Sequence, residues 1–255
     1  MLEITPVPIL ADNYTWVIRA PNNDAAIVVD PGEAQPVARA LKGFGLNLAG
    51  ILVTHHHHDH IDGVAALASA GVPVFGPDDQ RIPALTHPLR AGERFEPPGL
   101  GTTFEVFETP GHTLEHIVFY GGGVLLAGDA LFAGGCGRMF EGNAPQMVGY
   151  LAELRDLPPT TQLYCGHEYT AANLAFAQAV EPNNAHLQKR IETVTAQRSN
   201  GSTTLPSTLG EERETNPFLR WDEPPVVDQA SQHAGRALQT PAEVFAVLRD
   251  WKDHF

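Results

Sequence analysis

One run of ligand-type side chains, Thr54-His55-His56-His57-His58-Asp59-His60, carries the clearest chemical signal in the sequence. It follows an apolar stretch typical of a buried strand and precedes an alanine-rich stretch typical of a helix. Because side chains two apart on an extended segment point the same way, we expect His55 and His57 to share one metal ion. Asp59 and His60 follow where the chain turns into the helix, and they can face a second cation. Imidazole and carboxylate ligands suit zinc, iron or manganese.

Three further ligand-type residues each follow a predicted strand and lie beside a glycine: His112 in TPGHT, Asp129 in AGDA and His167 in CGHE. Glycine lets the backbone turn tightly, and loops at strand ends often carry functional side chains. Alone, each residue would more often be a cap or a core residue. Together with the run they supply the seven ligands that a two-metal centre can use: His55, His57, Asp59, His60, His112, Asp129 and His167.

Two milder interpretations apply to these histidines. A solvated, tag-like histidine loop is disfavoured, because tags lie at chain ends and lack the strand-to-helix context. For His56, His58 and His116, which lie near the predicted ligands, packing or surface exposure is the favoured interpretation.

Short strands and helices alternate through the part of the chain that must position these residues. Strands are predicted at 14–19, 25–30, 48–53, 72–75, 104–108, 117–120, 124–127 and 162–165, and helices at 35–44, 61–70 and 144–157. The segment 77–103 is predicted to hold loops and short edge strands. After His167 the pattern is helical, at 171–180, 185–195 and 241–251, around a polar, proline-rich segment at 199–225. An α/β body at residues 1–167, followed by a helical domain at 168–255, is therefore expected.

Composition excludes several classes of protein. The chain has 255 residues, 43% of them hydrophobic, which allows a full core and argues against disorder. Its net charge of −14 repels phosphate backbones, so no nucleic acid is expected as a partner. The two cysteines, Cys136 and Cys165, cannot form a disulfide framework. Since neither a signal peptide nor a membrane span is recognisable, we expect a soluble, cytoplasmic protein without a membrane partner, acting as a monomer.

The motif T-H-x-H-x-D-H, followed by single His, Asp and His residues after later strands, resembles the metallo-β-lactamase superfamily. Within it, the sequence closely resembles the glyoxalase II family of hydroxyacylglutathione hydrolases. The resemblance covers essentially the whole chain. Its motifs are LADNYTWVI, VVDPGE, ILVTHHHHDHIDG, ETPGHT, LLAGDALFAGGCGRMFEG, LYCGHEYTAANLAFA, EPNN, ETNPFLRW and RDWKDHF, of which the last three separate glyoxalase II from other superfamily members.

The resemblance implies a four-layer αβ/βα sandwich followed by a small helical domain. It assigns His55, His57 and His112 to one metal and Asp59, His60 and His167 to the other, with Asp129 bridging. It also implies contacts to glutathione from Arg138, Tyr169, Arg249 and Lys252.

The sequence departs from the family pattern at three positions. Arg138 and Phe140 stand where the family often has Lys and Tyr, and Glu115 stands where it usually has Gly. Arginine keeps the positive charge at its position. Phe140 cannot donate the hydrogen bond of a tyrosine hydroxyl.

The implied reaction is hydrolysis of S-D-lactoylglutathione, and of related S-2-hydroxyacylglutathiones, to glutathione and D-lactate, the second step of methylglyoxal detoxification. Two divalent metal ions per chain, zinc foremost and iron or manganese as alternatives, can share a bridging hydroxide that attacks the thioester carbonyl. Asp59 and Asp129 would orient this hydroxide. The thiol has a pKa of about 8.5 and can leave as a thiolate without an obligatory general acid.

The substrate is a glutathione thioester, whose two carboxylates need cationic partners on an acidic protein. Arg249 and Lys252 lie three residues apart and so share one face of the final predicted helix. Without the resemblance, ordinary solvated helix charge would be the better interpretation of both.

Two other kinds of function are considered. A superfamily relative, such as a lactonase, a β-lactamase or an iron-dependent persulfide dioxygenase, shares parts of the metal motif. A β-lactamase would normally carry a signal peptide, and a dioxygenase would not need a full second set of ligands. A structural metal protein would close four ligands, often cysteines, around one ion. Seven His and Asp ligands from four loops do not fit that pattern.

Overall fold

The computed structural model describes residues 2–255; Met1, with which the expected first domain begins, lies outside the described residues. Within this range the strands form two six-stranded sheets and one two-stranded sheet. The first sheet has the order β1 (Glu3–Ile9), β2 (Asn13–Arg19), β3 (Ala25–Val29), β4 (Asn47–Leu52), β5 (Val74–Pro77) and β6 (His87–Leu89). The second has the order β14 (Ser207–Thr208), β13 (Gln162–Cys165), β10 (Val124–Gly128), β9 (Ile117–Gly121), β8 (Phe104–Glu108) and β7 (Arg94–Phe95). The small sheet pairs β11 (Leu131–Phe132) with β12 (Gly135–Cys136).

The pairing of the first sheet brings two strand ends together. Strands β1 to β3 are antiparallel, whereas β3, β4, β5 and β6 run parallel to one another. The carboxyl ends of β3 and β4 therefore lie side by side at one edge of the sheet. Asp30 follows β3 there, and the histidine run follows β4.

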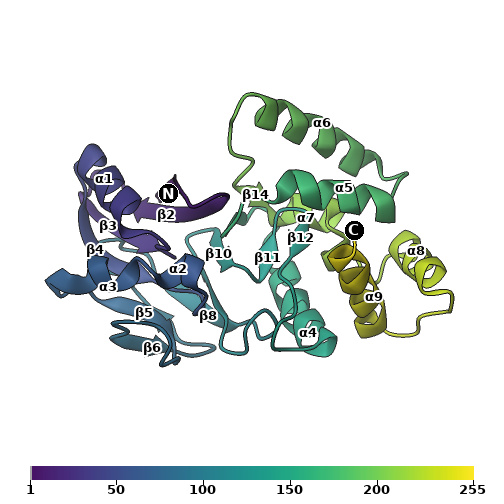
Figure 1. Cartoon of the computed structure of the whole chain (residues 1–255), viewed down its shortest axis with the longest axis horizontal. Helices are drawn as coiled ribbons and strands as arrows, with labels where there is room; N and C mark the ends of the chain where they lie inside the picture. Colours follow the sequence, from purple (N-terminus) through teal and green to yellow (C-terminus); the bar gives the residue numbers. More distant parts are fainter. Residues whose placement is uncertain (1) are drawn as a thin grey trace. The chain divides into compact units, whose positions relative to one another are not determined.

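Three helices cover one face of this sheet: α1 (Ala34–Phe44), α2 (His58–Ile61) and α3 (Val64–Leu67) (Figure 1). Val37 and Leu41 of α1 are buried against Val17 and Val28 of the sheet. Farther along the same face, α2 and α3 bury their apolar residues against β4 and β5. Helix α1 ends at Phe44, as predicted, and Gly45 caps it with a φ of 68°, which suits glycine.

The contacts within the chain define two compact units. The first consists of the chain up to Glu108, Glu115–Asp129 and Tyr164–His167; the second consists of Thr109–Leu114, Ala130–Leu163 and Glu168–Phe255. The helices of the second unit are α4 (Ala144–Asp156), α5 (Thr170–Val180), α6 (Ala185–Ser199), α7 (Leu209–Thr215), α8 (Pro224–Ala234) and α9 (Pro241–Asp253).

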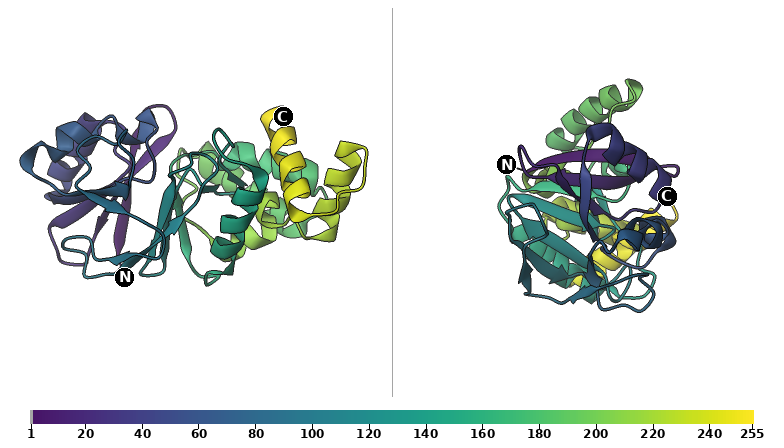
Figure 2. Two further views of the ribbon diagram at one scale, coloured as in Figure 1. Left: turned by 90° about the horizontal axis from the view of Figure 1, so that it is seen from below. Right: turned by 90° about the vertical axis from the view of Figure 1, so that its left-hand side faces the viewer.

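Aromatic side chains form the core of the second unit. Phe176 of α5, Phe245 of α9 and Phe218 between α7 and α8 are fully buried, and Phe218 packs against both of the others. Figure 2 shows α8 beside α9, and the two helices contact each other. Among residues 2–255, every helix falls short of the length and apolarity that crossing a membrane requires.

One predicted element was wrong, and the sequence did not predict the elements at two other places. The helix expected at 61–70 is broken into α2, α3 and a 3-10 turn, because the amide of Gly63 donates to the carbonyl of Pro31 instead of to its own helix. The segment 199–225 holds α7, which Thr208 caps through its hydroxyl, and the start of α8 at Pro224. Strand β1 escaped prediction because two prolines interrupt its pattern, which an edge strand tolerates.

Candidate metal centre

Four predicted ligands converge in the first unit. Nε2 of His60 lies 3.4 Å from Oδ2 of Asp59 and 3.4 Å from Oδ1 of Asp129. Nε2 of His167 lies 3.4 Å from Oδ2 of Asp59 and 3.4 Å from Oδ2 of Asp129. Tetrahedral zinc with bonds of about 2.0–2.1 Å holds its ligand atoms roughly 3.3 Å apart. The spacing of these four groups therefore fits a divalent cation.

His55 extends this cluster. Its ring centroid lies 4.2 Å from that of His60 and 4.7 Å from that of His57. Ligand atoms of His55, His60 and Asp129 all lie within 4.8 Å of one another. Asp129 is thus within reach both of His55 and of the pair His60 and His167, as a bridging carboxylate must be.

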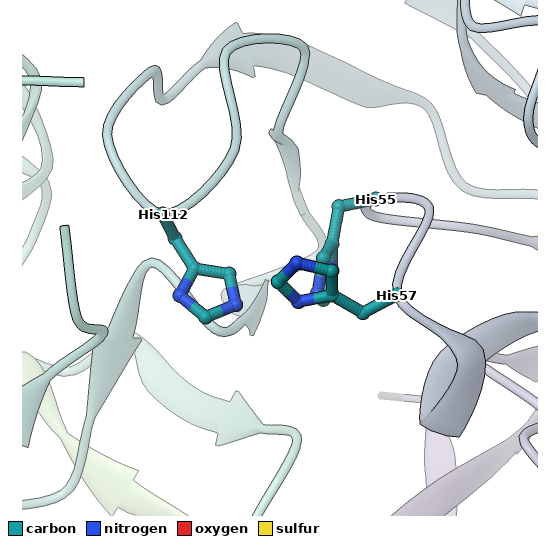
Figure 3. Close-up of side chains that lie close together, drawn as sticks. All are labelled: His55, His57 and His112. Atoms are coloured by element: carbon teal, nitrogen blue, oxygen red, sulfur yellow. The ribbon is translucent and has the colours of Figure 1, made fainter. Parts of the chain in front are cut away.

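The last predicted ligand, His112, belongs to the second unit. Figure 3 shows the elements that carry the three histidines assigned to the first metal: His55 and His57 lie on the segment from β4 to α2, and His112 lies on the loop that follows β8. Nδ1 of His112 is 3.1 Å from the carbonyl oxygen of Arg138. A proton on Nδ1 satisfies this contact and leaves Nε2 as the ligand atom.

Carboxylates behind the imidazoles orient two of the other ligands. Oδ2 of Asp30 is 3.1 Å from Nδ1 of His60, and Oδ1 of Asp12 is 2.8 Å from Nδ1 of His167. Asp30 also accepts hydrogen bonds from the backbone amide and the hydroxyl of Thr54, each at 2.8 Å. Such contacts fix the tautomer of a histidine and direct Nε2 toward the metal.

None of these orienting groups was predicted from the sequence. Asp30, Asp12 and Asn13, whose Nδ2 donates to Oδ2 of Asp59 at 2.8 Å, were missed. Asp30 left a usable signal, because a carboxylate that ends a strand parallel to β4 lies at the same edge as the histidine run. Asp12 and Asn13 had no such signal in the sequence, since the residues of a turn between two antiparallel strands do not indicate which part of the fold the turn contacts.

The three neighbouring histidines have different surroundings. His58 is exposed and contacts Asp62 on the surface. His116 is fully buried, where its Nε2 accepts the backbone N–H of Asp129 at 3.2 Å. Nδ1 of His56 lies 3.2 Å from Oδ2 of Asp79. Surface exposure and packing, the favoured interpretations, hold for His58 and His116, but His116 also holds the backbone of a predicted ligand.

Opposite charges in the cluster outweigh the effect of burial on its pKa values. Burial lowers the pKa of His167, but hydrogen bonds to Asp129 and Asp59 raise it to about 10. Burial raises the pKa of Asp59, but His167 and His60 hold it well below its usual value. In the same way, carboxylates raise the pKa of His60 and imidazoles lower that of Asp129. The pocket therefore favours positive charge, which a divalent cation can supply in place of protons.

Glycine permits the close approach of strand ends around the ligands. A Cβ on Gly166 would lie 2.6 Å from Oδ1 of Asp129 and 2.7 Å from Cε1 of His60. Gly128 has a φ of 48°, and a Cβ there would lie 2.4 Å from the hydroxyl of Thr54. The tight turns expected beside Asp129 and His167 thus have two causes, a left-handed backbone at Gly128 and a lack of space at Gly166.

The cations predicted to bind glutathione gather in the second unit around Asp253. Nη2 of Arg249 donates to Oδ1 of Asp253 at 3.0 Å, and Nε of Arg138 lies 3.5 Å from the same oxygen. Arg249 is only 4% exposed, so ordinary solvated helix charge does not describe it. Lys252 is half-buried, and its Nζ lies 3.4 Å from the carbonyl oxygen of Ala172.

Tyr169 and Phe140 lie elsewhere in the same unit. Tyr169 precedes the first turn of α5, and its ring meets that of Phe132 edge-on. Phe140 is 61% exposed, with its ring centroid 5.2 Å from that of His112.

Glu115, the unusual residue after the His112 loop, takes part in an ion-pair chain. Its Oε2 is 2.7 Å from Nη2 of Arg81, whose guanidinium also binds Asp79. Asp79 in turn contacts His56, between two predicted ligands. Glu115, which departs from the family pattern, is thus connected to the histidine run through Arg81 and Asp79.

Comparison with known proteins identifies relatives along the whole chain. Residues 10–167 match the model of the metallo-β-lactamase superfamily, and residues 168–255 match that of the hydroxyacylglutathione hydrolase C-terminus. A hydroxyacylglutathione hydrolase of Alkalilimnicola ehrlichii is 50% identical over 99% of both chains. One of Pseudomonas fluorescens is 49% identical over 100% of both chains.

Solved structures share the fold at lower identity. ETHE1 from Myxococcus xanthus has a TM-score of 0.68 at 22% identity, covering 98% of this chain and 91% of that one. The BLEG-1 B3 metallo-β-lactamase has a TM-score of 0.62 at 23% identity, covering 86% of this chain and 99% of that one. With the two family models, these matches confirm the predicted fold class, a metallo-β-lactamase fold with a helical C-terminal region.

Proposed function

Because the chain belongs to the hydroxyacylglutathione hydrolase family of the metallo-β-lactamase superfamily, we propose that it is a glyoxalase II, which hydrolyses S-D-lactoylglutathione to glutathione and D-lactate. Related S-2-hydroxyacylglutathiones would be substrates of the same site. The observation that carries the proposal is the convergence of Asp59, His60, Asp129 and His167 at metal-ligand spacing in a member of this family.

We propose that the centre holds two divalent cations, zinc foremost and otherwise iron or manganese. His55, His57 and His112 would bind one, and Asp59, His60 and His167 the other, with Asp129 between them. The 3.4 Å spacing of the ligand atoms and the reach of Asp129 toward His55 support this assignment.

When bound, the cations lower the pKa of water and stabilise negative charge on the thioester carbonyl oxygen. The protein contributes orientation. Asp30 and Asp12 fix the imidazoles of His60 and His167 from behind, and Asn13 holds Asp59. Asp59 and Asp129 accept hydrogen bonds from the attacking water. The thiol, with a pKa of about 8.5, can leave as a thiolate without a general acid.

We propose that the glutathione portion binds in the helical region at residues 168–255, through Tyr169, Arg249 and Lys252, together with Arg138, which precedes that region in the chain. Two carboxylates on the ligand need cationic partners, and the three cations among these residues gather within the second unit. The functional division would fall between residues 167 and 168, where the match to one family model ends and that to the other begins.

We also propose that the protein acts as a monomer in the cytoplasm. Cys136 and Cys165 lie outside any disulfide within residues 2–255, which fits a reducing compartment. Light scattering at working concentration tests the first statement, and cell fractionation tests the second.

The deciding experiment follows the loss of thioester absorbance of S-D-lactoylglutathione, with metal analysis of the same sample. The wild type should hydrolyse it with at least one metal ion per chain. Asp129→Ala should be at least about a hundredfold slower, whereas Asp250→Ala, on the exposed side of α9, should match the wild type. A fully metallated wild type that leaves the thioester intact would refute the assignment. Lactones and glutathione persulfide would then be tested as substrates.

A further inference from the structure

Two arginines of the second unit, Arg138 and Arg249, contact the same carboxylate, that of Asp253, and Lys252 immediately precedes it in the chain. Arg249, Lys252 and Asp253 lie at the end of α9, and Arg138 follows β12. A single oxygen, Oδ1 of Asp253, lies 3.0 Å from Nη2 of Arg249 and 3.5 Å from Nε of Arg138. Besides burial, the charges of Arg249 and Arg138 lower the pKa of Lys252, which shows how closely the positive charges gather. On a chain of net charge −14, this is a concentrated anion-attracting position.

The guanidinium of Arg249 is only partly used by the protein. Nη1 donates to the carbonyl oxygen of Cys136 at 3.0 Å, and the ring of Phe218 covers one of its faces. Nη2 donates to one oxygen of Asp253. Nε is buried and has no hydrogen-bond partner within residues 2–255. Nε and Nη2 form one edge of the fork, which can bind both oxygens of a carboxylate at once. Asp253 uses only half of that edge.

We propose that Asp253 is an internal counter-ion that occupies this edge until a carboxylate of glutathione displaces it, so that Asp253 sets the affinity of the site. This inference rests on the proposed function, which supplies the carboxylate. Arg249 is 4% exposed, so an incoming carboxylate reaches the edge only after Asp253 moves away. Asp253 can move, because it is the last residue of α9 and its side chain is 32% exposed.

The exchange is favourable in geometry and in charge. A ligand carboxylate that binds Nε and Nη2 together satisfies the buried Nε, which Asp253 leaves unpaired. The released carboxylate of Asp253 becomes solvated at the end of α9. The side chain of Arg138 is 62% exposed, so it can move and pair with the carboxylate of Asp253 or with that of the ligand. Because each bound ligand must first replace Asp253, the internal carboxylate weakens binding and eases the release of glutathione after hydrolysis.

The test is Asp253→Asn in the full-length, metal-loaded protein, which keeps the size of the side chain and removes its charge. The KM for S-D-lactoylglutathione, and the dissociation constant of glutathione from calorimetry, should both fall about three- to tenfold. The matched control is Asp250→Asn, which makes the same change of charge on the same helix at a residue whose side chain is 77% exposed. It should change neither constant. The diethyl ester of glutathione, which has no free carboxylate, should bind wild type and Asp253→Asn equally.

Three results would overturn the inference. A raised KM would show that Asp253 positions the cations, and an unchanged KM would show that it does not compete. An equal gain in affinity for the diethyl ester would show that no carboxylate is exchanged. Each leaves the proposed function intact provided that the wild type hydrolyses the thioester, whereas an inactive wild type refutes the function itself. Asp253→Ser serves as a second variant, and circular dichroism checks the helix, which loses a charge unfavourable to its C-terminus.

Discussion

At the residue scale, Asp30 shows how one buried carboxylate can organise the proposed metal centre without belonging to its proposed ligand set. It contacts Nδ1 of His60 and holds the amide and hydroxyl of Thr54, the residue immediately before His55. The hydroxyl of Thr54 lies 3.0 Å from Nδ1 of His55. One side chain therefore fixes the direction of a histidine from each proposed metal-ligand set.

Asp30→Asn tests this role. The amide keeps the shape but removes the charge behind His60, so metal affinity should fall about 10- to 100-fold. Activity should drop at limiting zinc and recover when zinc is added in excess. Asp62→Asn, a surface change beside His58, is the control and should leave the zinc titration unchanged. Equal affinity in both variants would contradict the orienting role of Asp30.

Protons and metal compete for the same histidines. The pKa of His167 is raised from 6.5 to about 10 in the metal-free protein. Its protonation therefore stabilises the metal-free fold fully below pH 6.5, and this contribution is lost as the pH rises through about 10. Metal must displace that proton, so the apparent dissociation constant should fall up to about tenfold per pH unit between pH 7 and 9. Calorimetry in two buffers of different ionisation heat should detect released protons; zero release would contradict the shift.

At the element scale, the ends of β4, β10 and β13 must meet closely for their following residues to converge. Gly166 marks the tightest point after β13, since its missing Cβ would overlap Asp129 and His60. Its backbone amide donates to the carbonyl oxygen of Gly128, which joins the ends of β13 and β10. The glycine is required for space beside the ligands.

Gly166→Ala should therefore reduce bound metal and activity, and overpacking should lower stability by about 1–3 kcal/mol. Gly149→Ala, inside α4, is the matched control, because a Cβ there meets nothing within 4 Å. It should raise stability by about 0.5–1 kcal/mol, since alanine is the better helix former. Metal analysis and thermal unfolding compare the two variants. Full metal occupancy in Gly166→Ala would contradict this prediction, because it would show that the strand ends can move apart and still leave the ligands in place.

At the scale of the whole molecule, the proposed ligands come from four segments between His55 and His167, so bound metal would link distant parts of the chain. Stripping the metal with a chelator should lower the melting temperature by about 5–10 °C, if free metal is normally about a hundredfold above its dissociation constant. Returning zinc should restore both the melting temperature and the activity. Asp129→Ala should show a much smaller shift, and an equal shift in both proteins would contradict a shared centre.

Local patterns predicted much of the fold and failed at identifiable places. Strands such as β4 and β8 and helices such as α1 and α9 follow the periodicity of their own side chains. The helix expected at 61–70 failed because the amide of Gly63 pairs with Pro31, about thirty residues away. Strand β1 failed because its prolines are tolerated only at a sheet edge, and an edge is a property of the assembled sheet.

The sequence by itself predicted His and Asp as the metal ligands, and it determined the family of the chain. The ligands could be predicted because alternation along an extended segment and glycine at strand ends are local features of the sequence. The family could be recognised because its motifs span nearly all 255 residues. Only the tertiary structure decided what lies behind each ligand. Asp12 and His167 are 155 residues apart, and no local periodicity records that they meet. The burial of Arg249 against Asp253 could not be predicted either, because the sequence pattern of a charged residue on a helix face is the same whether water or protein surrounds its side chain.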